Sequence, residues 1–343
     1  MLIAILIIFA FGLLIFFHEF GHFLMAKILK IKILEFSFGL GKEIIGKTIG
    51  GTRYSISLLP IGGAVKLKGE NIEELDTEAD SFFGKKWYQR MLVVIMGPLM
   101  NYVLAVIIFF ILLYFFGLTV ISNEPVIGNV IEGKPAHLVG LKRNDRILKI
   151  DNVPVNSWEE MAQKIHNSAN KKIYLEVLRE NTTLYFEIIP TEDPASQRGI
   201  IGIVPGYKKE RLNLIGSLKT AITQPVILSV FSLRYLLEKI IKLQKPEIAG
   251  PIGIVEVLSK AAKSGFENFL YTVGVISSML ALFNLFPVPI LDGGHIMFCI
   301  FEAITRKLPS KKLFEVSNLI GLTFLLFLLM FATYSDILRI FKK

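Results

Sequence analysis

The segment His18-Glu19-Phe20-Gly21-His22 carries side chains that can bind and use a transition metal. Residues four apart lie on one face of a helix, so the imidazoles of His18 and His22 can bind the same zinc ion. Glu19 lies beside them, where its carboxylate can accept a proton from a water molecule that the metal activates. The spacing therefore predicts a zinc site for hydrolysis, with Glu19 as the catalytic base.

A catalytic zinc ion usually has three protein ligands, so a third must come from elsewhere in the chain. Asp292 is the best candidate, because it lies in an apolar run that Pro287, Pro289 and the glycines at 293–294 interrupt. A broken helix in a membrane exposes backbone groups that need protein or water as partners, which suits a site where a peptide and water meet. The alternative for Asp292 is a helix cap at the kink. We expect that His295 is not a ligand.

Long apolar runs predict the overall architecture. Hydrophobic residues make up 52% of the 343 residues and concentrate in runs that can cross the ~30 Å core of a bilayer as helices. We expect a polytopic α-helical membrane protein with about four transmembrane helices, at residues 2–29, 91–118, 268–303 and 313–337. Histidine and glutamate are costly to place in such a span, which favours a functional interpretation of His18, Glu19 and His22.

Basic residues predict the orientation. Lys and Arg are frequent in residues 30–90 and in the short connection at 306–312, and short cytoplasmic loops collect these residues. Both segments are therefore expected in the cytoplasm, with the N-terminus, residues 119–267 and the C-terminus outside. The histidine motif would then lie near the cytoplasmic end of the first span.

The segments between the apolar runs differ in character. In residues 31–70, apolar and polar residues alternate on either side of glycine pairs. This pattern predicts a membrane-associated β-hairpin that is buried in protein or lines a cavity. Residues 122–207 have the pattern of a compact α+β module. Residues 208–267 form an amphipathic connecting region, broken near residues 245–246 and 250–251, that lies on the membrane surface or packs on the helices. The expected regions are 1–118, 122–207, 208–267 and 268–343.

Two motifs together resemble those of the site-2 protease family of intramembrane zinc metalloproteases, and the likeness covers nearly the whole chain. The segment 18–23, followed by Ala26-Lys27, is similar to the first family motif. The segment 284–294 is similar to the family's NxxPxPxLDGG motif. This resemblance implies one Zn²⁺ per chain, bound by His18, His22 and Asp292. It also implies that Glu19 is the general base and that Asn284 binds or orients the substrate backbone.

The same resemblance implies a family β-loop that clamps an unwound substrate by strand pairing. The corresponding segment is 59–66, and its substrate-binding residues would be Gly62, Gly63, Ala64 and Val65. The family often has an aromatic residue at the position of Ala64. A segment of the second span is also similar to the family, and there we expect Gly97 and Asn101 to support helix packing.

Residues 122–207 resemble a single PDZ domain, inserted between the second and third spans. Pro135-Ala136 and the segment 140–147 carry this likeness, with Asn144 in place of the usual glycine. Asparagine also tolerates the turn conformation that glycine adopts there. The organisation is similar to the bacterial regulator-of-sigma-E protease group, which implies a bacterial inner membrane protein with the PDZ domain on the periplasmic side. That domain would bind a peptide or act as a size filter.

We therefore expect a zinc metalloendopeptidase that cleaves single-span membrane proteins within the bilayer, such as an anti-sigma factor or a remnant signal peptide. Nucleic acid is not an expected partner, because the chain has no basic arm with interleaved aromatic residues. One alternative is a catalytically inactive membrane scaffold built around the PDZ domain, which has no need of the intact motifs. The other is a transporter, which the absence of broken helices in both halves disfavours.

Overall fold

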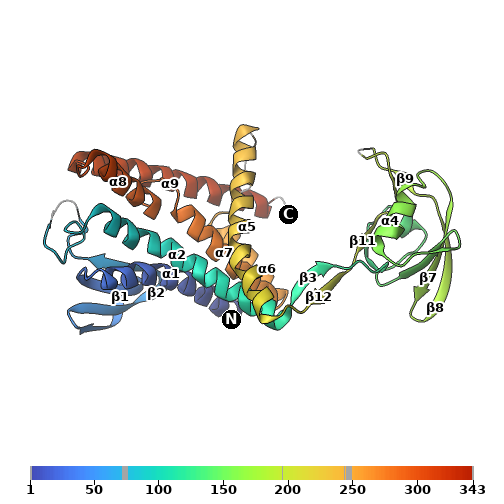
Figure 1. Ribbon diagram of the computed structural model, residues 1–343, viewed down its shortest axis with the longest axis horizontal. Coiled ribbons are helices and arrows are strands. Elements are labelled where there is room, and N and C mark those ends of the chain that lie inside the picture. Colours follow the sequence, from blue (N-terminus) through green and yellow to red (C-terminus); the bar gives the residue numbers. More distant parts are fainter. Residues whose placement is uncertain (1, 72–75, 195, 243, 245–248, 342–343) are drawn as a thin grey trace. The chain divides into compact units, whose positions relative to one another are not determined.

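The computed structural model divides the chain into two compact units. One contains Met1–Phe115 and Asn213–Lys343, and the other contains Phe116–Leu212. The structure describes residues 2–71, 76–194, 196–242, 244 and 249–341. The first unit is a bundle of apolar helices with a long hairpin, and the second is built mainly of short strands (Figure 1).

Among the described residues, five helices of the first unit are long and apolar enough to cross a membrane. They are α1 (Leu2–Ile28), α2 (Trp87–Ile111, continued by a π-turn to Phe116), α5 (Leu214–Ile241), α7 (Phe266–Asn284) and α9 (Lys311–Phe341). The structure therefore has several helices that could span a membrane, as expected. The expected number of about four is not confirmed, because α5 adds a fifth candidate.

Helix α5 lies in the region where the sequence predicts amphipathic helical stretches and no transmembrane span. It runs for 28 residues despite Pro225 in its interior. The Ser229 hydroxyl donates to the Pro225 carbonyl over 2.8 Å and lies 2.6 Å from the Tyr102 hydroxyl of α2, so this stretch has polar partners. The expected break at 250–251 is the start of α6 (Pro251–Lys263), and the one at 245–246 falls outside the described residues.

The third expected span consists of two helices. α7 ends at Asn284, and α8 (Asp292–Thr305) begins after the loop 285–291. Pro287 and Pro289 lack the N–H groups that a continuous helix needs. Ile290 adopts a φ of 83°, a conformation that β-branched residues rarely adopt. The loop thus turns the chain and places Asp292 at the first position of α8.

The hairpin is more elaborate than two paired strands. β1 (Ile33–Ile49) and β2 (Thr52–Leu67) are antiparallel around Gly50-Gly51, whose positive φ values of 60° and 84° suit a tight turn. Both strands also fold back, because Phe36 pairs with Tyr54 and with Val65. Four segments therefore lie side by side, with 63–67 at one edge; in order they are 43–49, 52–57, 35–38 and 63–67.

The second unit contains a four-stranded antiparallel sheet in the order β6-β5-β7-β8. Its strands are β5 (Arg146–Ile150), β6 (Val153–Pro154), β7 (Ile173–Arg179) and β8 (Thr182–Ile188). The unit also contains α3 (Pro135–Leu138), α4 (Trp158–His166) and three strand pairs: β4 (Ile127–Val130) with β11 (Ile203–Pro205), β9 (Thr191–Glu192) with β10 (Gly199–Ile200), and β3 (Leu118–Ile121) with β12 (Tyr207–Glu210).

Side chains from this sheet and from α4 enclose the core of the second unit, and Ile147, Met161 and Val177 within it are fully buried. Asn144 has a φ of 70°, the left-handed conformation expected where it replaces glycine.

Candidate metal centre

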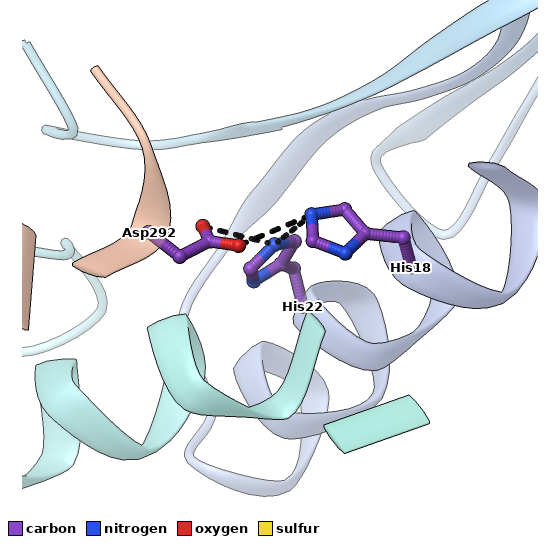
Figure 2. Close-up of side chains that lie close together, drawn as sticks. All are labelled: His18, His22 and Asp292. Carbon is purple, nitrogen blue, oxygen red and sulfur yellow. Dashed lines mark hydrogen bonds and ion pairs between the residues drawn. The ribbon is translucent and has the colours of Figure 1, made fainter. Parts of the chain in front are cut away.

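Helix α1 places His18 and His22 one turn apart on the same face. Their Nε2 atoms are 3.3 Å apart, and the side chains are 16% and 15% exposed. Asp292 reaches the same point from the start of α8, as Figure 2 shows. Its Oδ2 lies 3.2 Å from Nε2 of His18 and its Oδ1 lies 3.5 Å from Nε2 of His22.

The spacing of these three side chains fits a zinc ion. Bonds of about 2.0–2.1 Å in a tetrahedron separate neighbouring donor atoms by about 3.3 Å. The three donor pairs here are 3.2, 3.3 and 3.5 Å apart. Oδ2 of Asp292 is buried and accepts no hydrogen bond from the described residues, as expected of an atom that a cation would engage. Two imidazoles and one carboxylate also leave the fourth position that catalytic zinc sites keep open.

Helix α2 supports the histidines from the other side. The main-chain carbonyl of Val93 lies 2.9 Å from Nδ1 of His22. A proton on that Nδ1 leaves Nε2 free to bind a metal, as the outer partners of metal-binding histidines generally do. Gly97 packs directly on both rings, because a Cβ there would overlap Nε2 of His22 and lie 3.0 Å from Cε1 of His18. The sequence alone predicts a helix-packing role for Gly97 and does not indicate its contact with the histidines.

Glu19 faces the edge segment of the sheet rather than open space. The backbone of Val65 lies near its carboxyl group. A Cβ on Gly63 would lie 3.1 Å from Cγ of Glu19 and 3.0 Å from the Ser37 carbonyl, so only glycine fits without displacement. Gly62 has a φ of 104°, which also favours glycine. Of the four residues expected to bind substrate, Gly63 and Val65 therefore lie beside the candidate base, and Gly62 precedes Gly63 in the chain. Ala64 is exposed.

The remaining candidates lie on either side of the loop 285–291. Asn284 is the last residue of α7 and is partly buried. His295 lies one turn into α8, where its ring packs 5.8 Å from that of Phe314. Within the described part of the chain, the group that could hold a metal consists of His18, His22 and Asp292 and does not include His295.

Comparison with known proteins places the chain in a family. A model described as Peptidase family M50 matches residues 6–328. A Rickettsia conorii protein named "Putative zinc metalloprotease" is 33% identical over 349 residues, which cover 96% of this chain and 97% of that protein. A Clostridium acetobutylicum protein of the same descriptive name is 32% identical, covering 97% of this chain and 96% of its own.

Two further likenesses are more distant. Regulator of sigma-W protease RasP of Bacillus subtilis is 27% identical, with 99% of this chain and 98% of that protein covered. Among solved structures, the PDZ domain of the SdrC-like protein of Listeria innocua is 24% identical and covers 24% of this chain and 93% of its own. The TM-score of that match is 0.22, which does not establish a fold.

Proposed function

The chain belongs to peptidase family M50, the site-2 protease family, and from this premise we propose that it is an intramembrane protease that hydrolyses peptide bonds within transmembrane segments of membrane proteins. The family match confirms the resemblance of the two motifs, and the chain is a metalloprotease that uses zinc. One observation carries the proposal: Asp292 lies close to His18 and His22 of α1, a helix long enough to span a membrane.

We assign the zinc ion to His18, His22 and Asp292 and the role of base to Glu19. A zinc ion held by these residues would polarise the scissile carbonyl and lower the pKa of water to about 7. The Glu19 carboxylate accepts a proton from the attacking water and then delivers it to the nitrogen of the leaving amine. Glu19 is thereby returned to its ionised form when the peptide bond has broken.

Substrate positioning falls to the edge segment and to Asn284. The carbonyls of a substrate helix are hydrogen-bonded within the helix, so the segment must unwind before cleavage. Segment 63–67 is paired on one side only within the described residues, and its free side can accept an added strand. Main-chain bonds to Gly62, Gly63, Ala64 and Val65 would offset those lost on unwinding, and Asn284 would orient the substrate backbone.

The course of α2 and α7 supports four spans rather than five. The Ser277 hydroxyl of α7 donates to the Asn101 carbonyl, and Gly274 packs on Phe109 of α2, so the two helices are antiparallel. If α2 begins on the cytoplasmic side and ends on the outer side, the antiparallel α7 begins on the outer side. The chain between α2 and α7 then starts and ends outside, so α5 cannot be a single additional span within it. The spans would be α1, α2, α7 with α8, and α9, with both termini outside.

We further propose that residues 122–207 are a PDZ domain on the periplasmic side of a bacterial inner membrane, with the active site near the cytoplasmic side. A cavity of 250 Å³ lies between α4 and residues 199–203, lined by apolar side chains such as Trp158 and Met161. It would take the apolar end of a peptide. Substrates would be single-span proteins, such as an anti-sigma factor or a remnant signal peptide.

The test is cleavage of a single-span model substrate by the full chain in detergent, with bound zinc quantified. We expect Glu19→Gln to retain zinc and to lose roughly 10²–10⁴-fold in cleavage rate, the share that a general base contributes. Glu43→Gln is the matched control, because this exposed carboxylate pairs with Arg53 near the hairpin turn. If the wild-type chain binds no zinc and cleaves nothing, the inactive scaffold becomes the better interpretation. Undiminished cleavage by Glu19→Gln would remove Glu19 from the mechanism.

A further inference from the structure

Asn101 of α2 is a buried polar residue in contact with a candidate metal ligand. Its side chain is 1% exposed, and its amide nitrogen lies 3.4 Å from Nδ1 of His18. Its amide oxygen, Oδ1, is buried and has no hydrogen-bond partner among the described residues. A buried amide with an unused acceptor costs free energy unless a partner is supplied.

The chemistry of His18 identifies that partner. Nε2 of His18 faces His22 and Asp292, so Nε2 is the atom that would bind a metal. A neutral imidazole that binds through Nε2 carries its proton on Nδ1, which is then a donor and needs an acceptor. The amide of Asn101 has one donor end and one acceptor end of nearly equal size. A half-turn of this amide exchanges two ends of nearly equal size and brings the unused Oδ1 to Nδ1 of His18.

The surrounding helices hold Asn101 at this position. The Ser277 hydroxyl of α7, fully buried, donates to the main-chain carbonyl of Asn101 over 2.8 Å. Val93, Gly97 and Asn101 are spaced four residues apart, so they follow one another along one face of α2. Val93 engages Nδ1 of His22 through a main-chain carbonyl, whereas Asn101 engages Nδ1 of His18 through a side chain.

We propose that Asn101 is a positioning residue, whose side-chain carbonyl accepts the Nδ1 proton of His18 and so presents Nε2 to the zinc ion. The inference rests on the metal site assigned under the proposed function. Removing an outer partner of a ligating histidine typically weakens metal binding by roughly 10–100-fold. A side chain that retained an acceptor would retain the binding.

The experiment measures zinc affinity of the full chain in detergent by competition with a chelating fluorophore, and records the absorption spectrum of the cobalt-substituted protein. Asn101→Leu and Asn101→Ala, which lack the acceptor, should bind zinc about 10–100-fold more weakly. Asn101→Asp, which keeps one, should bind within about tenfold of wild type. Tyr102→Phe is the control, since the neighbouring hydroxyl contacts Ser229 and not the histidines.

The outcomes separate this inference from the proposed function. Wild-type affinity and an unchanged cobalt spectrum in Asn101→Leu or Asn101→Ala would overturn the role of Asn101 and leave the metal site intact. An equal loss in Asn101→Asp would also overturn it, because restoring the acceptor would then have no effect. A wild-type chain without zinc would overturn the proposed function itself. Alanine is a good helix former, so Asn101→Ala serves if the leucine variant does not fold.

Discussion

Gly97 allows α2 to approach closely the face of α1 that carries the candidate ligands His18 and His22. Any Cβ at this position would overlap the ring of His22. We expect Gly97→Ala to displace that ring, to destabilise the protein by about 1–3 kcal/mol, and to weaken zinc binding by at least about tenfold. Zinc titration and thermal unfolding measure the two effects.

The matched control for Gly97→Ala is Gly274→Ala on α7. Its Cβ would meet only side-chain atoms of Phe109 and Ile108, 3.1–3.2 Å away, which can give way. We expect this variant to bind zinc like wild type. Equal zinc affinity in both variants would show that the close approach at Gly97 does not bear on the metal site.

At the scale of single residues, the sequence indicates the candidate ligands more clearly than the residues that support them. His18 and His22 are recognisable because helical periodicity places them on one face, and Asp292 because a carboxylate in a broken apolar helix is costly. Val93 acts through its main-chain carbonyl, which every residue has, so no residue type marks it. Gly97 and Asn101 acquire their contacts only when α2 meets α1, which no local pattern encodes.

Among the elements, α2 and α8 are joined by a buried ion pair between Arg90 and Glu302. Arg90 is 4% exposed, and its guanidinium also lies 5.0 Å from the ring of Phe83 and donates to the Lys85 carbonyl. Because α8 carries Asp292 at its first position, this pair holds the helix that supplies the third candidate ligand.

Removal of the Glu302 carboxylate should leave the buried Arg90 guanidinium without an opposite charge. We expect Glu302→Leu to lower the free energy of unfolding by about 3–5 kcal/mol, and Arg90→Met combined with Glu302→Leu to recover most of it. Unfolding by SDS in mixed micelles measures both. Glu315→Gln should change it by less than about 1 kcal/mol, because its pair with Lys311 is about half exposed. A double variant as unstable as the single one would contradict this account.

The sheet and α5 show where element-level prediction from sequence stops. Alternation and the glycine turn predict a hairpin, and β1 and β2 do pair around Gly50-Gly51. The alternation of apolar and polar residues is the same whichever strand is the neighbour, however. It therefore does not reveal that Phe36 pairs with a strand on each side. Pro225 and scattered polar residues make α5 hard to recognise as one long helix, and the contact of its Ser229 with Tyr102 of α2 forms only in the folded bundle.

For the whole molecule, each unit has a core of its own. Apolar residues of α1, the hairpin and α2, including Phe23, Leu67 and Val93, form one core, and a separate cluster fills the second unit. Asp145, fully buried in the second unit, accepts two hydrogen bonds of 2.7 Å from Arg179. Separate cores predict that the second unit can unfold while the metal site persists.

Arg179→Met tests this prediction. The substitution leaves the Asp145 charge buried and unpaired, which should destabilise the second unit by about 3–5 kcal/mol. Limited proteolysis should then cut within residues 116–212, while bound zinc stays at the wild-type level. Lys172→Met is the matched control, because its pair with Glu187 on the same sheet is half exposed and should contribute less than about 1 kcal/mol. Loss of zinc from Arg179→Met in step with proteolysis would show instead that the two units fold as one.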